Sequence, residues 1–176
     1  MFEINVDNKT VIDTLDRLAS ALSNPRPYFL GIGDGLVLST KRRFETGTAP
    51  DGTPWAENSQ TTYLQQLVDS KGGKLKSYHR KDGRINSRGA EKMMGKKPLI
   101  GRTRLLSQQI YYQVNGNELS WGSPMKYAAM QNFGGTKSEF PHLWGDIPAR
   151  QFMGISESDE EMIISTASDY LRSVIG

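Results

Sequence analysis

The residues best placed to do chemistry in this sequence are cations. Between Asp69 and Arg104 lie twelve of the 22 Lys and Arg residues, opposed by only three carboxylates. That stretch carries a formal charge of +9, whereas the whole chain carries +3, so the rest of the chain is acidic. Clustered cations on a glycine-rich backbone can contact phosphates or an acidic protein surface. The residues predicted to make such contacts are Lys71, Lys74, Lys76, Arg80, Lys81, Arg84, Arg88, Lys92, Lys96 and Lys97.

Three interpretations of this basic stretch stay open. It can be a plain solvated loop, a nucleic-acid-binding arm, or a docking arm that orders on an acidic protein partner. Only two rings, Tyr78 and His79, are interleaved with the cations and available for base stacking. Any nucleic-acid binding would therefore be nonspecific and sensitive to salt.

Reactive side chains do not form a recognisable catalytic or metal-binding pattern. The two histidines, His79 and His142, have no metal-ligand spacing, and there is no cysteine. The carboxylates at 159–161 suit the first turn of a helix better than a catalytic pair. The glycines at 31, 33 and 35 lack the strand and the Gly-Lys-Ser/Thr of a phosphate loop, and indicate helix packing or a hinge. The sequence therefore predicts no enzyme, no cofactor and no metal.

The length and composition suit a single domain covering 1–176, with 70–98 as an extended basic loop or arm. Without cysteine there are no structural disulfides. No apolar run of 18 residues exists, and the first residues lack the apolar core of a signal peptide. We expect synthesis in the cytoplasm and no membrane contact.

Hydrophobic periodicity predicts the elements before the basic stretch. Residues 2–6 alternate as a short strand, and 8–22 have apolar residues on one helical face. A second helix is expected over 25–47, although its three glycines weaken it. A Pro-Asp-Gly turn follows at 50–52, and a short helix is expected over 59–68.

The elements after the basic stretch predict an α+β fold. Asn115-Gly116-Asn117 between β-rich runs predicts a hairpin, and 124–133 a brief helix stopped by two glycines. A strand is expected within 147–155, followed by a last helix capped by Ser156 or Ser158. The fold class is then α+β, with a small, mainly antiparallel sheet packed by helices.

Three separated segments resemble the phage virion morphogenesis family, the tail-completion proteins of contractile-tailed and Mu-like phages. They are Arg43-Phe44 with Pro50-Asp51-Gly52-Thr53-Pro54-Trp55-Ala56, then Leu105 through Trp121-Gly122 to Tyr127–Gly135, and finally Ile147-Pro148-Ala149-Arg150-Gln151-Phe152-Met153-Gly154-Ile155-Ser156. Gln131-Asn132 stands where a His-Gln pair is common in the family, and the basic insertion is longer than is usual there.

The resemblance implies a structural protein of the virion neck, similar in fold to tail terminators and head–tail joining proteins. Such proteins form closed, often six-fold rings. The expected partners are other copies of the chain, the head connector or adaptor, the tail terminator or tail tube, and DNA in the lumen if the basic arm faces it. An open sheet edge and head-to-tail contacts suit ring closure.

Four residues are predicted to lie at subunit interfaces: Trp55, Trp144, Arg150 and Phe152. Tryptophans in proline- and glycine-rich loops are more often local core residues, and interface anchoring is the alternative for these two. Arg150 can equally pair with carboxylates of 157–161 in the same chain. The predicted function is completion of the tail and its joining to the head by a hexameric ring. The alternatives are a nonspecific nucleic-acid-binding module built on 71–104, and a capsid-assembly factor absent from the virion.

Overall fold

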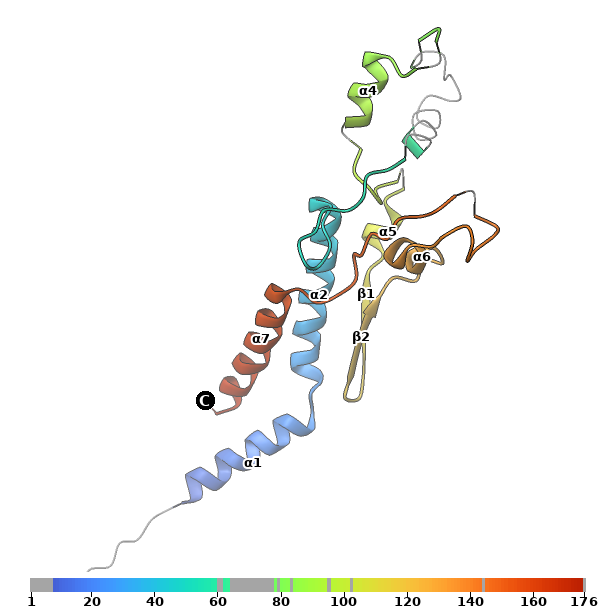
Figure 1. The fold of residues 1–176 in the computed structure, drawn as a ribbon. Helices are drawn as coiled ribbons and strands as arrows, with labels where there is room; N and C mark the ends of the chain where they lie inside the picture. The colour runs from blue at the N-terminus through green and yellow to red at the C-terminus, as the bar shows by residue number, and fades with distance from the viewer. Residues whose placement is uncertain are drawn as a thin grey trace, which may run out of the picture. The chain divides into compact units, whose positions relative to one another are not determined.

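A computed structural model describes residues 8–59, 62–63, 78, 80–82, 84–94, 96–101, 103–143 and 145–175. Its helices are α1 (Lys9–Ser23), α2 (Arg26–Thr46), α4 (Ser87–Met94), α5 (Leu105–Gln108), α6 (Ala128–Phe133) and α7 (Glu157–Ile175). The strands β1 (Tyr111–Asn115) and β2 (Glu118–Gly122) form an antiparallel hairpin (Figure 1). Helices with a small antiparallel sheet confirm the predicted α+β class.

The chain divides into two compact units. Unit 1 comprises Met1–Ser39, Tyr111–Gly122 and Ile155–Gly176, and unit 2 comprises Thr40–Ile110 and Ser123–Gly154. Unit 1 therefore holds α1, most of α2, the hairpin and α7. Unit 2 holds the end of α2, the shorter helices and the loops that connect them.

In unit 1, α2 packs closely because its glycines carry no side chain. A Cβ at Gly33 would lie 2.6 Å from Cγ of Tyr112 on β1, and a Cβ at Gly35 would lie 2.6 Å from Sδ of Met162 on α7. The hairpin and α7 thus approach different faces of α2, since Gly33 and Gly35 lie about 200° apart round the helix. Figure 1 shows α7 alongside α2. The prediction that these glycines serve helix packing is confirmed.

The hairpin and α7 follow their local sequence signals. Asn115 pairs with Glu118, so Gly116 and Asn117 form a two-residue loop in which Gly116 has a φ of 56°. At the start of α7, the Ser156 hydroxyl accepts from the Asp159 N–H (3.3 Å), and the Asp159 carboxylate accepts from the Ser156 N–H (2.9 Å). This reciprocal capping confirms Ser156 as the N-cap.

The core of unit 2 is aromatic. Phe44 from α2 stacks against Trp55 (ring centroids 5.4 Å apart) and Phe152 (5.1 Å), and all three are buried. Leu106 of α5 and Ile110 are buried as well. Edge-to-face and tilted ring pairs of this kind stabilise more than their area alone.

Two expectations about regular structure are wrong. No strand forms within 147–155; its only ladder contact is an isolated bridge between Gly135 and Ile147. The following backbone groups are satisfied by side chains instead, so no partner strand is needed. Within the basic stretch, expected to be structureless, α4 forms because the Asn86 side chain accepts from the Gly89 N–H (2.9 Å) and caps the helix.

Other expectations fall partly or wholly on undescribed residues. The strand at 2–6 lies outside the described residues, as do all but residues 59, 62 and 63 of the expected helix at 59–68. Residues 62 and 63 are helical. None of the described helices is long and apolar enough to cross a membrane.

Candidate functional site

Parts of all three segments that carry the family resemblance meet in unit 2, round the backbone of residues 150–154. The Arg43 guanidinium donates through Nη1 to the carbonyls of Phe152 (2.9 Å) and Gly154 (2.8 Å). The Trp55 indole N–H donates to the carbonyl of Gln151 (3.0 Å). Residues a hundred positions apart in sequence therefore fix one short stretch of extended chain.

Asn132 of α6 satisfies the other side of this stretch. Its side-chain carbonyl accepts from the N–H groups of Phe152 (3.0 Å) and Met153 (2.9 Å). The carbonyl of Gln131 accepts from the Arg150 N–H (2.9 Å). Asn132 is only 5% exposed and the Phe152 donor is buried, so the Phe152 N–H has no ready access to water as a substitute acceptor. Sequence reasoning had given Asn132 no role, because nothing local indicates its distant partners.

The Arg150 side chain contacts a different part of the backbone, residues 56–57. Its Nε donates to the carbonyl of Ala56 and its Nη2 to that of Glu57, both at 2.7 Å. The side chain is 6% exposed, and burial lowers the pKa of its guanidinium from the ordinary value. In the part of the chain that the structure describes, Arg150 forms no ion pair. It is a buried cation balanced by carbonyl dipoles.

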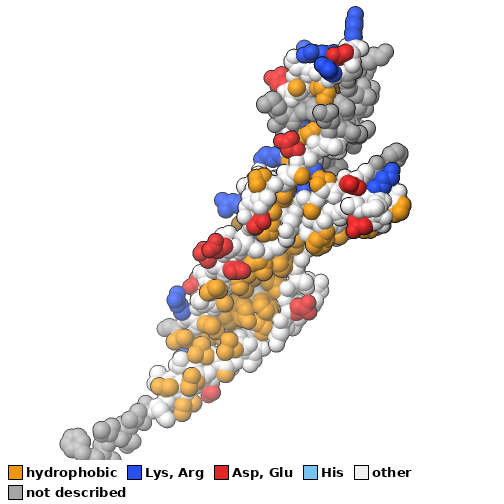
Figure 2. Space-filling model, in the orientation of Figure 1, with side chains coloured by type: hydrophobic (Ala, Val, Ile, Leu, Met, Phe, Trp, Pro, Cys, Tyr) orange, Lys and Arg blue, Asp and Glu red, His pale blue; other side chains and the backbone are white. Residues whose placement is uncertain are grey.

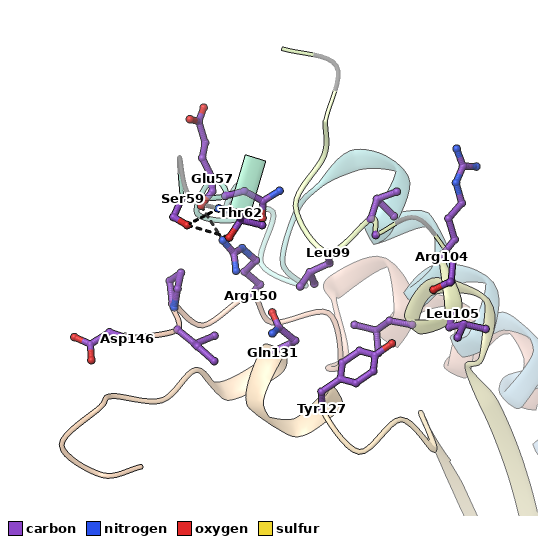
Figure 3. Close-up of a pocket in the computed structure, with 17 residues that line it drawn as sticks. Glu57, Ser59, Thr62, Leu99, Arg104, Leu105, Tyr127, Gln131, Asp146 and Arg150 are labelled. Atoms are coloured by element: carbon purple, nitrogen blue, oxygen red, sulfur yellow. Dashed lines mark hydrogen bonds between the residues drawn. The ribbon is translucent and has the colours of Figure 1, made fainter. Parts of the chain in front are cut away.

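An open cavity of about 580 Å³ lies beside Arg150. Figure 3 shows Arg150 and Gln131 on one side of it, with Tyr127 and Leu105 further along. The buried Asn58 Nδ2 has no hydrogen-bond partner among the described residues. Among the described residues, no group of three or more His, Cys, Asp or Glu side chains could hold a metal ion.

The four predicted interface residues have different positions. Trp55 and Phe152 are buried in the unit 2 core, at 6% and 1% exposure. Arg150 is buried beside the cavity, and Trp144 lies outside the described residues. For Trp55, the structure matches the core position that the sequence analysis preferred over an interface position. An interface role for these residues stays a prediction, as does either predicted salt bridge of Arg150.

The described cations of the basic stretch lie on the surface. The exposed ones are Arg80, Lys81, Arg84, Arg88, Lys96 and Lys97. Lys97 donates through Nζ to the Glu45 carbonyl. Lys71, Lys74 and Lys76 lie outside the described residues, as does the side chain of Lys92. Tyr78 is only 2% exposed, so its ring is not available to stack on a base.

Unit 1 exposes a set of large apolar side chains. Figure 2 shows hydrophobic side chains gathered over this part of the molecule. We call this set the apolar surface of unit 1. Its members are Val11, Ile12, Leu15, Leu22, Leu30, Leu38, Tyr111, Ile155, Ile164 and Ile175. An amphipathic pattern predicts a buried face but not which molecule buries it.

Comparison with known proteins agrees with the resemblance of the motif segments. The sequence profile of the phage virion morphogenesis family matches residues 6–172. The chain belongs to this family. It is also 25% identical to Mu-like prophage FluMu G protein 2 of Haemophilus influenzae, over 99% of both chains. No solved structure matches the chain. Membership indicates a structural role in virion morphogenesis and confirms the predicted family.

Proposed function

We propose that this family member is a structural protein of the virion neck, which completes the tail and joins it to the head as a homo-oligomeric ring of six copies. Its partners are the head connector or adaptor and the tail terminator or tail tube. Family membership over 6–172 carries the proposal. We further propose that the chain is not an enzyme.

The site geometry supports a passive, load-transmitting role. The family segments use their polar groups on one another's backbone: Arg43 and Arg150 on carbonyls, and Asn132 on N–H groups. Side chains whose polar atoms are hydrogen-bonded to the backbone hold a loop in one conformation, and few of their polar atoms remain free to act on a substrate. The apolar surface of unit 1 supports self-association, because large exposed apolar patches mark interaction sites.

Electron microscopy of particles made without this protein tests the proposal. We expect complete heads and separate tails that do not join, and restoration when the protein is supplied. Normal heads joined to normal tails would refute it. Mass spectrometry of purified virions separates it from a capsid-assembly factor, which would be absent from them.

A second candidate function is nonspecific binding of DNA in the neck lumen, favoured by the exposed cations of the basic stretch. Changing Arg80, Lys81, Arg84 and Arg88 to Gln removes four of them. If each of these cations contacts one phosphate, its loss should reduce the slope of log Kd against log salt concentration by about 0.9. The four substitutions together should then reduce that slope by roughly 3–4. Band-shift titrations between low and physiological salt measure this slope.

The matched control neutralises four exposed cations outside the basic stretch: Arg17, Arg42, Lys126 and Lys137. The control should keep most of the slope. An equal loss in both variants would show only a response to net charge, and no band shift of the native chain at low salt would end the DNA hypothesis.

A further inference from the structure

The hairpin of unit 1 carries the single Asn-Gly dipeptide of the chain at its turn. Asn115 is the last residue of β1 and Gly116 the first of the two-residue loop, and both are exposed. The amide carbon Cγ of an asparagine lies close to the backbone nitrogen of the next residue, and a glycine presents that nitrogen without a hindering side chain. The residues that make this turn are therefore also the most open to attack of the backbone on a side chain.

The loop is uncrowded, and it contains an internal control. A Cβ built on Gly116 would meet no atom within 4 Å, so no neighbouring group blocks the glycine. Asn117 is exposed as well, but it is followed by Glu118, whose side chain hinders the corresponding backbone nitrogen. Two asparagines in one turn thus differ chiefly in the residue that follows each of them.

A neighbouring side chain is placed to promote attack on Asn115. The Gln113 side chain donates through Nε2 to Oδ1 of Asn115 (3.2 Å). The two side chains share the outer face of β1, because residues two apart in a strand point the same way. A donor on the carbonyl oxygen stabilises the negative charge that develops there when a nucleophile adds to the carbon. Gln113 therefore makes Cγ of Asn115 more electrophilic.

We propose that Asn115 is a site of spontaneous deamidation, promoted by Gln113, and that the product loosens the end of the hairpin. The Gly116 nitrogen forms a bond to Cγ of Asn115 and loses its proton, the Cγ–Nδ2 bond breaks, and Nδ2 leaves as ammonia. Water then opens the resulting succinimide ring at either carbonyl. One opening gives an aspartate, and the other gives an isoaspartyl residue whose Cβ lies in the main chain.

Strand pairing sets the pace of this reaction. Asn115 is paired with Glu118, and closing the ring requires its backbone to turn out of the extended conformation. This pair is the last of the ladder, where strands open first, and a two-stranded hairpin has little stability of its own. The reaction thus proceeds through local opening of the turn and does not require the whole chain to unfold.

The product should disturb the turn but not the packing of the hairpin. It carries a carboxylate directly opposite Glu118, and like charges in opposite positions destabilise a strand pair. An isoaspartyl residue also lengthens the backbone next to a loop whose length sets the strand register. Tyr112, which packs against Gly33 of α2, lies about 10 Å further along the strand. The loosening should therefore stay at the end of the hairpin.

Incubation of the purified full-length chain at mildly alkaline pH tests the proposal, because base takes the proton from the attacking nitrogen. Trypsin leaves Asn115 and Asn117 together in the peptide 105–126. We expect a gain of one mass unit that grows over weeks and that fragmentation assigns to Asn115. An isoaspartyl methyltransferase should label part of the product, since only the ring yields an isoaspartyl residue. No gain at Asn115, or an equal gain at Asn117, overturns the proposal.

Variants of the neighbouring residues test the mechanism. Gly116→Ala hinders the nitrogen and should slow the reaction at least about tenfold, even though strain in the turn favours opening. Gln113→Ala removes the exposed donor and should slow it about two- to fivefold, less than a buried donor would. Ser120→Ala changes the residue paired with Gln113 and should keep the native rate. An unchanged rate in G116A overturns the succinimide route, and an unchanged rate in Q113A overturns the role of Gln113.

The consequence for the hairpin is measured on a product made directly, Asn115→Asp. Its matched control is Asn117→Asp, which adds the same charge within the loop but not opposite Glu118. Backbone amide exchange at the end of the hairpin should be faster in N115D than in N117D, while exchange at Tyr112 stays native. Equal exchange in the two variants overturns the predicted loosening.

Discussion

Removal of the Asn132 side chain should loosen the segment on which the family residues converge. The variant Asn132→Ala deletes the acceptor of the Phe152 and Met153 N–H groups, which lie 3.0 and 2.9 Å from it. Phe152 is 1% exposed, so its N–H cannot exchange the lost acceptor for water without the core opening. A buried donor left without a partner costs about 1–3 kcal/mol.

The expected loss follows from these two bonds and one opposing effect. The buried Phe152 donor left unsatisfied costs about 1–3 kcal/mol, the part-buried Met153 donor adds less, and replacing Asn by Ala within α6 returns at most about 0.7 kcal/mol of helix propensity. We therefore expect the free energy of unfolding to fall by about 1–4 kcal/mol. For a chain of this length, this lowers the melting temperature by roughly 2–15 °C.

Thermal and urea unfolding, followed by the near-ultraviolet circular dichroism of the aromatic side chains, measure this loss. The matched control is Gln131→Ala, a neighbour on the same helix for whose side chain no hydrogen bond is found among the described residues. The control should change the free energy of unfolding by less than about 1 kcal/mol. If N132A is no less stable than Q131A, the side chain does not hold the 150–154 backbone.

Three further predictions concern other contacts. Gly33→Ala gains helix propensity of about 1 kcal/mol but drives a methyl into the tyrosine ring of β1, so we expect net destabilisation of about 0–2 kcal/mol by urea unfolding. Gly31→Ala is the control: its new Cβ meets the Thr166 methyl at 3.1 Å, a tight contact but a longer one than at Gly33, so it should destabilise less than Gly33→Ala. Arg150→Lys keeps the charge but loses the fork that reaches two carbonyls, and should lower the free energy of unfolding by about 1–3 kcal/mol; a stability equal to the native value would contradict this. The hydroxyl and N–H of Thr136 hold the pKa of the Glu139 carboxyl below its ordinary value, so this contribution to stability is complete above the ordinary pKa and is lost as the pH falls through the folded pKa. Thr136→Val should move that pKa upward in an NMR titration of the carboxyl carbon, and an unchanged titration would show that the hydroxyl bond is absent.

Local rules in the sequence decided most of the regular elements. The helices α1, α2, α6 and α7 and the β1–β2 hairpin follow from apolar period, caps and the Asn-Gly turn, all of which act between residues a few positions apart. These signals work because a helix or a two-residue turn is stabilised largely by near neighbours. Asn86 is a residue type that favours helix caps, but the charged, glycine-rich sequence round it has too little apolar period for the sequence to predict α4.

The tertiary structure alone decided what the buried polar residues of the family segments do and which apolar faces stay exposed. Arg43, Arg150 and Asn132 bond to backbone groups about 20 to 110 positions away, and no local pattern specifies such partners. The same is true of residues 147–155, whose β-like composition formed no strand because side chains satisfied its backbone. The apolar face of α1 was correctly recognised, but only the packed structure shows that much of it stays exposed. An amphipathic pattern shows that one face of a helix tends to be buried. Only the packing of the helices shows whether the chain itself covers that face or leaves it exposed.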